Sequence, residues 1–157
     1  MSAGIGSVSP RRPDETDLAE LHAVLAAECE GEVRGDPYTR HLFSRDASMY
    51  AIEPLLVAFP RHAGDVEALV RLTREAAVPL LARGAGTSLA GQTVARAVVV
   101  DFSRHMDGIL ELDPEARVAR VQPGIVQADL NRAARAHGLM FGADTFWPRH
   151  RAAPRAA

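Results

Sequence analysis

The residues best suited to chemistry form one run, Arg83-Gly-Ala-Gly-Thr-Ser-Leu-Ala-Gly-Gln92. Its glycines lack a Cβ atom and permit positive φ angles, so successive backbone N–H groups can converge on an anion. These glycines are at positions 84, 86 and 91. Thr87 and Ser88 add hydroxyl donors. A diphosphate is the natural guest of such a loop, and the alternative is a tight turn between strands that binds nothing.

Two common nucleotide-binding motifs nearly match this run, and both fail. Gly86 to Thr93 has the glycine spacing of a Walker A motif, but Gln92 stands where the phosphate-binding lysine should be. A dinucleotide-binding G-x-G-x-x-G motif would need glycine at position 89, which is Leu89. The sequence therefore argues against a P-loop nucleoside triphosphatase and against an NAD site.

A regular alternation of elements surrounds the run. Apolar segments predict strands at 55–59, 79–82 and 97–102, with an amphipathic helix between the first two. The expected buried face of this helix consists of Val66, Leu69, Val70, Thr73 and Ala77. Asp65 near its start suits the helix dipole. Strand, helix and strand in this order form a βαβ unit, which implies parallel pairing.

The flanking segments predict further elements. An apolar stripe from Leu18 to Cys29 indicates a helix that Thr16 or Asp14 could cap and Gly31 could end. Residues 31–54 read as a loop, with Asp36-Pro37 as a turn. Beyond the βαβ unit, strands at 109–112 and 117–121 form a hairpin.

A final helix is predicted between this hairpin and Gly138. Its apolar side consists of Val126, Leu130, Ala134 and His137. We therefore expect an α+β fold, in which a small parallel βαβ subdomain is followed by the start of a second, antiparallel α+β subdomain.

Composition narrows the function classes. The 157 residues carry 18 basic side chains, all arginine, against 20 acidic ones, and three arginines lie in the tail 147–157. Because the remaining body is acidic, a nucleic-acid partner is not expected. No apolar stretch has the length of a transmembrane segment or a secretory signal, so a cytoplasmic location is expected. The single Cys29 and the scattered histidines suggest neither a disulfide nor a metal site.

The glycine-rich run does not stand alone. Asp46-Ala-Ser-Met-Tyr50 and Pro54-Leu-Leu-Val precede it, and Gln122-Pro-Gly124 and Gly138-Leu-Met-Phe-Gly142 follow. This ordered series resembles the FAD-linked oxidases of the vanillyl-alcohol-oxidase type, in the branch with glycolate oxidase subunits and D-lactate dehydrogenases. The resemblance covers residues 45–144 and implies a PCMH-type FAD-binding domain.

The resemblance implies a set of cofactor-binding residues. The loop backbone would hold the FAD pyrophosphate through Gly84, Ala85, Gly86, Thr87, Ser88 and Gly91. Arg83 and Gln92 would either contact the cofactor or brace the loop. Pro123 and Gly124 match a second turn close to the cofactor, with a plain turn as the alternative. Relatives with covalent flavin carry histidine at the position of Thr87, so FAD is expected to bind non-covalently.

The resemblance also frames the domains and the reaction. We expect an N-terminal helix and loop (1–44), a partial FAD-binding domain (45–145) and an aberrant, disordered tail (146–157). The family pattern breaks near residue 145, and our hypothesis is a lost reading frame or a gene remnant.

A full-length family member would oxidise a small D-2-hydroxy acid such as lactate or glycolate through the flavin. No residue of this chain matches a catalytic base. Two alternatives are a catalytically silent fragment of a decayed or frameshifted gene, and a binding module that a partner chain completes. For this chain alone we expect weak or no FAD retention and no dehydrogenase activity.

Overall fold

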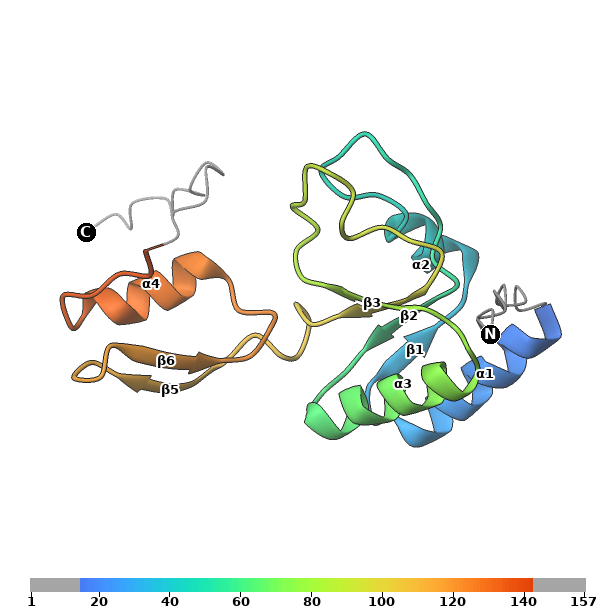
Figure 1. The fold of residues 1–157 in the computed structure, drawn as a ribbon, viewed down its shortest axis with the longest axis horizontal. Helices are drawn as coiled ribbons and strands as arrows, with labels where there is room; N and C mark the ends of the chain where they lie inside the picture. Colours follow the sequence, from blue (N-terminus) through green and yellow to red (C-terminus); the bar gives the residue numbers. More distant parts are fainter. Residues whose placement is uncertain (1–14, 143–157) are drawn as a thin grey trace, which may run out of the picture.

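The computed structural model describes residues 15–142, and it has two parts (Figure 1). Residues 15–106 form a first subdomain around a four-stranded sheet. Residues 107–142 form a smaller second subdomain, a two-stranded sheet with one helix. This is the expected α+β fold, with parallel strands first and an antiparallel pair second.

The larger sheet has the strand order β1-β2-β4-β3. Its strands are β1 (Glu32–Arg34), β2 (Leu56–Phe59), β3 (Leu80–Arg83) and β4 (Val98–Asp101). β4 lies between β2 and β3 and is parallel to both, and β1 pairs with β2 in the antiparallel sense. The register places Arg83 opposite Asp101, so the carboxyl ends of β3 and β4 lie at the same edge of the sheet.

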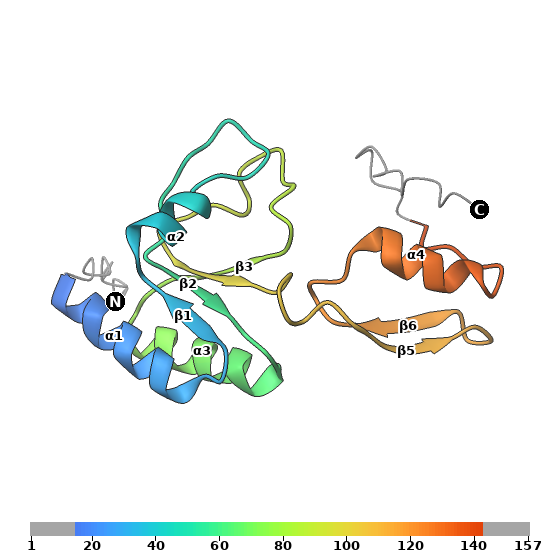
Figure 2. The ribbon, with the colours of Figure 1, turned by 180° about the vertical axis from the view of Figure 1, so that it is seen from behind.

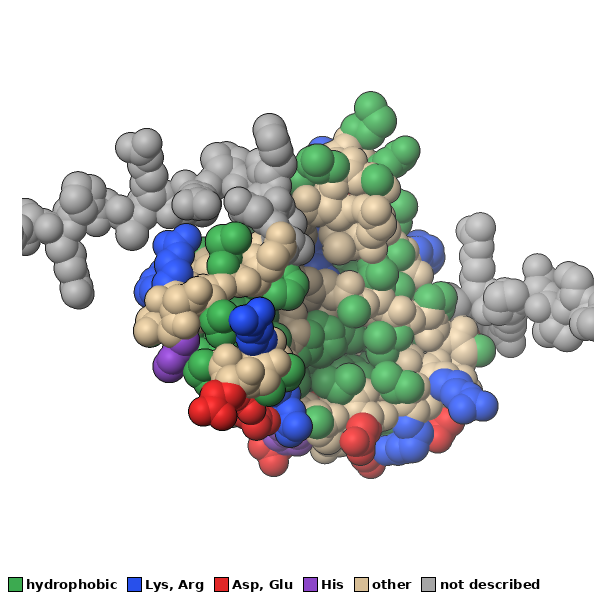
Figure 3. Space-filling view, turned by 60° about the vertical axis from the view of Figure 1, so that its left-hand side comes forward, with side chains coloured by type: hydrophobic (Ala, Val, Ile, Leu, Met, Phe, Trp, Pro, Cys, Tyr) green, Lys and Arg blue, Asp and Glu red, His purple; other side chains and the backbone are tan. Residues whose placement is uncertain are grey.

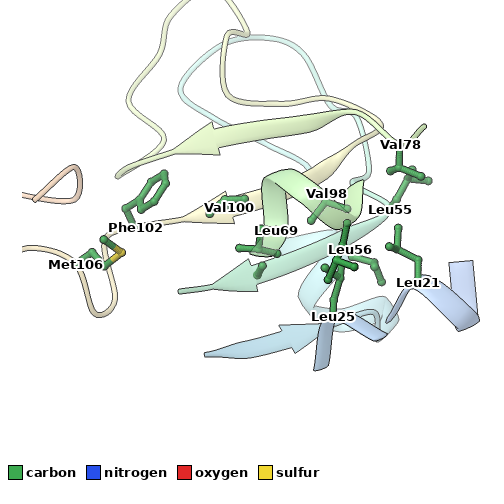
Figure 4. Packing of buried hydrophobic residues seen from close by; sticks show 12 residues of the cluster. Leu21, Leu25, Leu55, Leu56, Leu69, Val78, Val98, Val100, Phe102 and Met106 are labelled. Atoms are coloured by element: carbon green, nitrogen blue, oxygen red, sulfur yellow. The ribbon is translucent and has the colours of Figure 1, made fainter. Parts of the chain in front are cut away.

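Two helices, α1 (Glu15–Glu28) and α3 (Ala63–Glu75), lie side by side on one face of this sheet (Figures 1 and 2). They bury an apolar cluster against the strands (Figure 4). The cluster consists of Leu21, Leu25, Leu55, Leu56, Ala58, Leu69, Leu72, Val78, Val98, Val100, Phe102 and Met106. The core therefore draws on residues from both ends of the first subdomain.

A buried carboxylate joins the two helices. Asp65, in the first turn of α3, is 1% exposed and accepts hydrogen bonds from the backbone N–H groups of Arg61 (2.8 Å), Glu30 (2.9 Å) and Gly31 (3.1 Å). Burial pushes the pKa of Asp65 up, but the backbone hydrogen bonds from Arg61, Glu30 and Gly31 and the charge of His62 together leave the pKa below its usual value. Asp65 thus does more than complement the helix dipole.

The second subdomain consists of β5 (Ile109–Asp113), β6 (Val118–Val121) and α4 (Gln127–Arg135). β5 and β6 pair in the antiparallel sense, as the sequence predicts. Its buried apolar side chains within the described residues are Leu130 and Ala134, both on α4. Several large apolar side chains are exposed instead, including Leu110 (62%) and Val118 (58%). Figure 3, with this subdomain brought forward, shows hydrophobic side chains at its surface.

Three details differ from the prediction. The expected loop at 31–54 contains β1 and the helix α2 (Pro37–Leu42), because Asp36 caps that helix through the N–H of Thr39 rather than making a turn. The prediction of which residues form the buried face of α3 was also wrong in part. Val70 is 51% exposed and Ala77 lies beyond the helix, whereas Leu72 is buried.

The tail 146–157 lies outside the described residues, and the domain boundaries at 44/45 and 145/146 stay predictions. Between residues 15 and 142, no helix has the length and apolar character that a membrane span requires.

Candidate functional site

The glycine-rich loop, residues 84–93, begins where β3 ends. Phe102 directly after β4 donates its backbone N–H to the Arg83 carbonyl (3.0 Å), so the loop starts beside the carboxyl end of β4 as well. Loop residues line an open hollow of about 560 Å³. The carboxyl edge of parallel strands is the usual place for a ligand in such sheets.

The first six residues of this loop leave their backbone donors unused. None of the N–H groups of residues 84–89 donates a hydrogen bond to any part of the chain that the structure describes. The carbonyl of Gly86, in contrast, accepts a hydrogen bond from the N–H of Ala47 (3.0 Å). A run of unpaired donors next to a hollow is suited to an anion that has several acceptor oxygens.

The loop glycines divide into two kinds. Gly86 (φ 68°) and Gly91 (φ 77°) adopt the left-handed conformation that glycine permits. Gly84 does not use this freedom, because its φ angle is not positive. A Cβ atom on Gly84 would meet nothing within 4 Å. Neither backbone strain nor packing within residues 15–142 therefore requires glycine at position 84, whereas a ligand lying against the loop would.

Arg83 turns towards the protein. Its guanidinium donates to the backbone carbonyls of Arg45 (2.8 Å), Thr93 (3.1 Å) and Phe43 (3.4 Å). It also lies over the Phe43 ring, 5.1 Å from its centroid. Of the two roles expected for Arg83, these contacts favour the one that pins the loop to the subdomain.

Gln92 likewise favours the bracing role. Its side-chain Oε1 accepts a hydrogen bond from the Ser88 hydroxyl, and the Ser88 oxygen accepts from the backbone N–H of Gln92 (3.1 Å). Thr87 is exposed, and its hydroxyl bonds to none of the residues between 15 and 142. Thr87 is therefore the loop hydroxyl that is free for a ligand.

The second predicted turn lies at the same sheet edge. Gly124 donates its N–H to the Met106 carbonyl (2.8 Å), and a Cβ atom there would collide with the Phe102 carbonyl. Close packing on the segment after β4 therefore accounts for Gly124. Pro123 beside it is exposed. The turn thus packs against the residue that follows β4, and β4 is the neighbour of β3, the strand that leads into the glycine-rich loop.

Sequence reasoning gave no role to Asp46, which the structure places against the loop. Its carboxylate accepts from the Thr93 hydroxyl (3.0 Å) and from the Ser48 backbone N–H (2.9 Å). An Asp-x-Ser pattern is typical of a turn that the aspartate caps, which was the available signal. The described part of the chain contains no group of three or more His, Cys, Asp or Glu residues that could hold a metal ion.

Comparisons with known proteins agree with this arrangement. The family model "FAD binding domain" matches residues 54–148. A D-2-hydroxyglutarate dehydrogenase from Pseudomonas putida is 39% identical over 140 residues, which cover 87% of this chain and 14% of that protein. The glycolate oxidase subunit GlcD of Bacillus subtilis is 36% identical over 107 residues, covering 67% of this chain and 23% of that protein.

A solved alkyldihydroxyacetonephosphate synthase has the same fold, with a TM-score of 0.66 and 23% identity over 88% of this chain and 28% of that one. The chain thus spans a small part of the length of the curated relatives it matches, 14% for the first of them. The family match covers more than half of the chain and includes the glycine-rich loop, so this chain belongs to the FAD-binding domain family.

Proposed function

We propose that the glycine-rich loop binds the pyrophosphate of FAD. We further propose that the chain is the FAD-binding part of a flavin-dependent oxidoreductase that oxidises a D-2-hydroxy acid. The dehydrogenase and glycolate oxidase relatives support the substrate class. Of the residues predicted from the sequence, we propose that Gly84, Ala85, Gly86, Thr87, Ser88 and Gly91 bind the cofactor, that Arg83 and Gln92 brace the loop, and that Pro123 and Gly124 form the turn beside it.

The observation that carries this proposal is the run of free backbone N–H groups beside the open side of Gly84. A pyrophosphate offers several acceptor oxygens within a few ångströms and needs donors without adding bulk. Gly84 provides room for its approach, and the hydroxyl of Thr87 provides a further donor. The proposed site uses backbone and hydroxyl donors in place of a side-chain cation. Arg83, the cation next to the loop, already donates its hydrogen bonds to protein carbonyls.

The other proposed residues have supporting roles. Ser88 and Gln92 brace one limb of the loop, and Pro123 and Gly124 form the neighbouring turn. Thr87 replaces the histidine of covalent relatives, so the proposed attachment is non-covalent. Bound FAD would supply the electron acceptor, and the chain's own share is to bind and orient it. Because no residue is assigned as a catalytic base, we propose that this chain alone has no dehydrogenase activity. We also propose that it retains FAD weakly or not at all.

The test adds one methyl group at Gly84, where it would contact a bound ligand and no protein atom within 4 Å. Gly84→Ala leaves the fold unstrained, so we expect unchanged thermal unfolding and FAD affinity lower by about tenfold, which is about 1.4 kcal/mol. Gly142→Ala is the matched control, because a Cβ atom at Gly142 also meets nothing within 4 Å. FAD fluorescence titration measures both variants. Equal affinity in wild type and Gly84→Ala would contradict the proposal.

A second candidate is a binding module that a partner chain completes. The exposed Leu110 and Val118 on the two-stranded sheet favour it, because two strands alone make a marginal sheet. A stoichiometric second polypeptide that protects the β5 and β6 amides from hydrogen exchange would support this candidate. Protection of these amides by FAD alone would count against it. If neither FAD nor a partner binds, the silent-fragment alternative is favoured.

A further inference from the structure

Residues 43–50, which we call the clasp, lie against the glycine-rich loop although they are distant in sequence. The hydrogen bonds between the two segments join residues 38 to 47 positions apart. Both segments rise together above the sheet in Figures 1 and 2. The clasp precedes the residues that match the family model, 54–148. The loop is therefore shaped partly by a segment outside the matched domain.

The first limb of the contact runs through Arg83. Its guanidinium donates hydrogen bonds to the carbonyls of Phe43 and Arg45 in the clasp and to the carbonyl of Thr93 at the far end of the loop. A Cβ atom on Gly86 would collide with this guanidinium, so the loop backbone lies directly on it. One side chain thus ties both ends of the loop to the clasp.

The second limb runs through Asp46. One carboxylate oxygen accepts from the hydroxyl and the N–H of Ser48, and the other accepts from the hydroxyl of Thr93 (3.0 Å) and its N–H (3.4 Å). The Ser48 hydroxyl, with the backbone of Ser48 and the hydroxyl and backbone of Thr93, lowers the pKa of Asp46 to about 2. Asp46 is therefore ionised at neutral pH and joins the clasp to the end of the loop.

Two further contacts determine how the loop faces outward. The N–H of Ala47 holds the Gly86 carbonyl inward at 3.0 Å, which leaves the neighbouring N–H groups without a protein partner. The Tyr50 ring covers Gly91, where a Cβ atom would lie 2.7 Å from its Cδ2. The clasp contacts the loop at its start, middle and end.

We propose that the clasp preorganises the glycine-rich loop for a diphosphate, and that Asp46 is its positioning residue. The inference rests on the proposed function in one respect, because the ligand is taken to be the FAD pyrophosphate. A loop held in its binding conformation before the ligand arrives loses less conformational entropy on binding. The clasp therefore contributes to affinity without touching the cofactor.

The sign of one substitution separates positioning from plain electrostatics. A carboxylate near a diphosphate site repels the ligand, so neutralising it would raise affinity if Asp46 acted only through its charge. If Asp46 positions the loop, Asp46→Asn lowers affinity instead, because the amide nitrogen cannot accept the bonds from Thr93 or Ser48. Thr93→Val removes a hydroxyl partner of Asp46 without any change of charge and should act in the same direction.

The experiment uses ¹⁵N-labelled full chain as wild type, Asp46→Asn, Thr93→Val and the double variant. Asp107→Asn is the matched control, because Asp107 is exposed and makes no hydrogen bond within residues 15–142. We expect ¹⁵N order parameters of the amides at 84–89 to fall without ligand in both single variants and not in the control. Titration with FAD should show about tenfold weaker affinity in each, with the double variant little worse than either.

Unchanged order parameters together with equal or tighter FAD affinity in Asp46→Asn would overturn the clasp. Loosened loop amides in a chain that does not bind FAD in any variant would uphold the loop-ordering role of Asp46 and contradict the proposed function. Fully additive losses in the double variant would show that Asp46 and Thr93 act separately, which also overturns the clasp as described.

Discussion

The two subdomains differ in how completely they bury their own apolar side chains. The first encloses a cluster from α1, α3 and the sheet in which Leu25, Val98 and Val100 are fully buried. The second buries Leu130 and Ala134 among its described residues and leaves Leu110, Val118, Val126, Met140 and Phe141 exposed. Hydrophobic burial is the main stabilising term in folding, so the first subdomain should carry nearly all of the stability.

This difference bears on function, because each part carries one of the predicted turns. The glycine-rich loop is attached to the better packed subdomain and is held there by Arg83 and the clasp. The turn at Pro123 and Gly124 begins the helical half of the weaker subdomain and contacts the first through Met106. A ligand that engages both turns would be held firmly on one side and loosely on the other, which is the physical basis for the weak FAD retention we propose.

Core truncations should show the largest contrast. Leu25→Ala removes a fully buried side chain from the first subdomain and should lower the free energy of unfolding by about 3 kcal/mol. Leu130→Ala, in the second, should change the main unfolding transition by less than about 1 kcal/mol, because little structure depends on it. Urea unfolding followed by circular dichroism measures both. Similar losses in the two variants would break the distinction between the subdomains.

Asp65 tests the polar part of the first subdomain. In Asp65→Asn an amide nitrogen replaces one carboxylate oxygen. At the position of Oδ2 this nitrogen cannot accept the hydrogen bonds that the backbone N–H groups of Gly31 and Arg61 donate. The expected loss is about 2 kcal/mol in the free energy of unfolding, from unsatisfied buried donors. Asp107→Asn should be neutral in the same urea experiment. A neutral Asp65→Asn would mean that α1 and α3 are joined by apolar packing alone.

Acid should weaken the first subdomain through the same carboxylate. Because the folded-state pKa of Asp65 lies below its unfolded value, its stabilising contribution is complete above the unfolded pKa of about 4 and is lost as the pH falls through the folded value. Wild type should therefore lose more stability than Asp65→Asn between about pH 7 and pH 3. Parallel pH profiles for the two proteins would show that other carboxylates dominate acid unfolding.

The smallest effect concerns the loop itself. Gly86→Ala forces a Cβ atom into the left-handed region and onto the Arg83 guanidinium, so we expect a loss of about 1 kcal/mol. Gly84→Ala, two positions earlier, should cost nothing in the absence of ligand. Thermal unfolding of the two variants checks this pair. The opposite ranking would show that the glycine-rich loop is folded differently.

Local patterns in the sequence predicted most of the helices and strands but not the order in which the strands pair in the sheet. The runs around Val57, Leu81 and Val99 gave the three parallel strands, since buried strands are short and apolar. Nothing local in these runs indicates that β4 lies between β2 and β3. β1 was missed because its three residues, Glu32 to Arg34, have no apolar alternation, and it forms only by pairing with β2.

The candidate site was predictable in position more than in detail. The glycine spacing identified the loop, and the left-handed φ angles of Gly86 and Gly91 follow from it. The partners of Arg83 and Asp46 could not be predicted from the glycine spacing. They are 38 to 47 residues away and are largely backbone atoms, which leave no trace in side-chain patterns. The clasp is therefore visible only in three dimensions.

The central claim is that the free N–H groups of residues 84–89 bind a diphosphate. ¹H–¹⁵N spectra of the full chain, titrated with FAD and separately with inorganic pyrophosphate, test it most directly. Both ligands should shift the amide signals of Gly84 to Leu89 in a saturable way, with FAD also reaching the neighbourhood of Pro123. Signals of these amides that stay unmoved at saturating FAD, while others shift, would contradict the account.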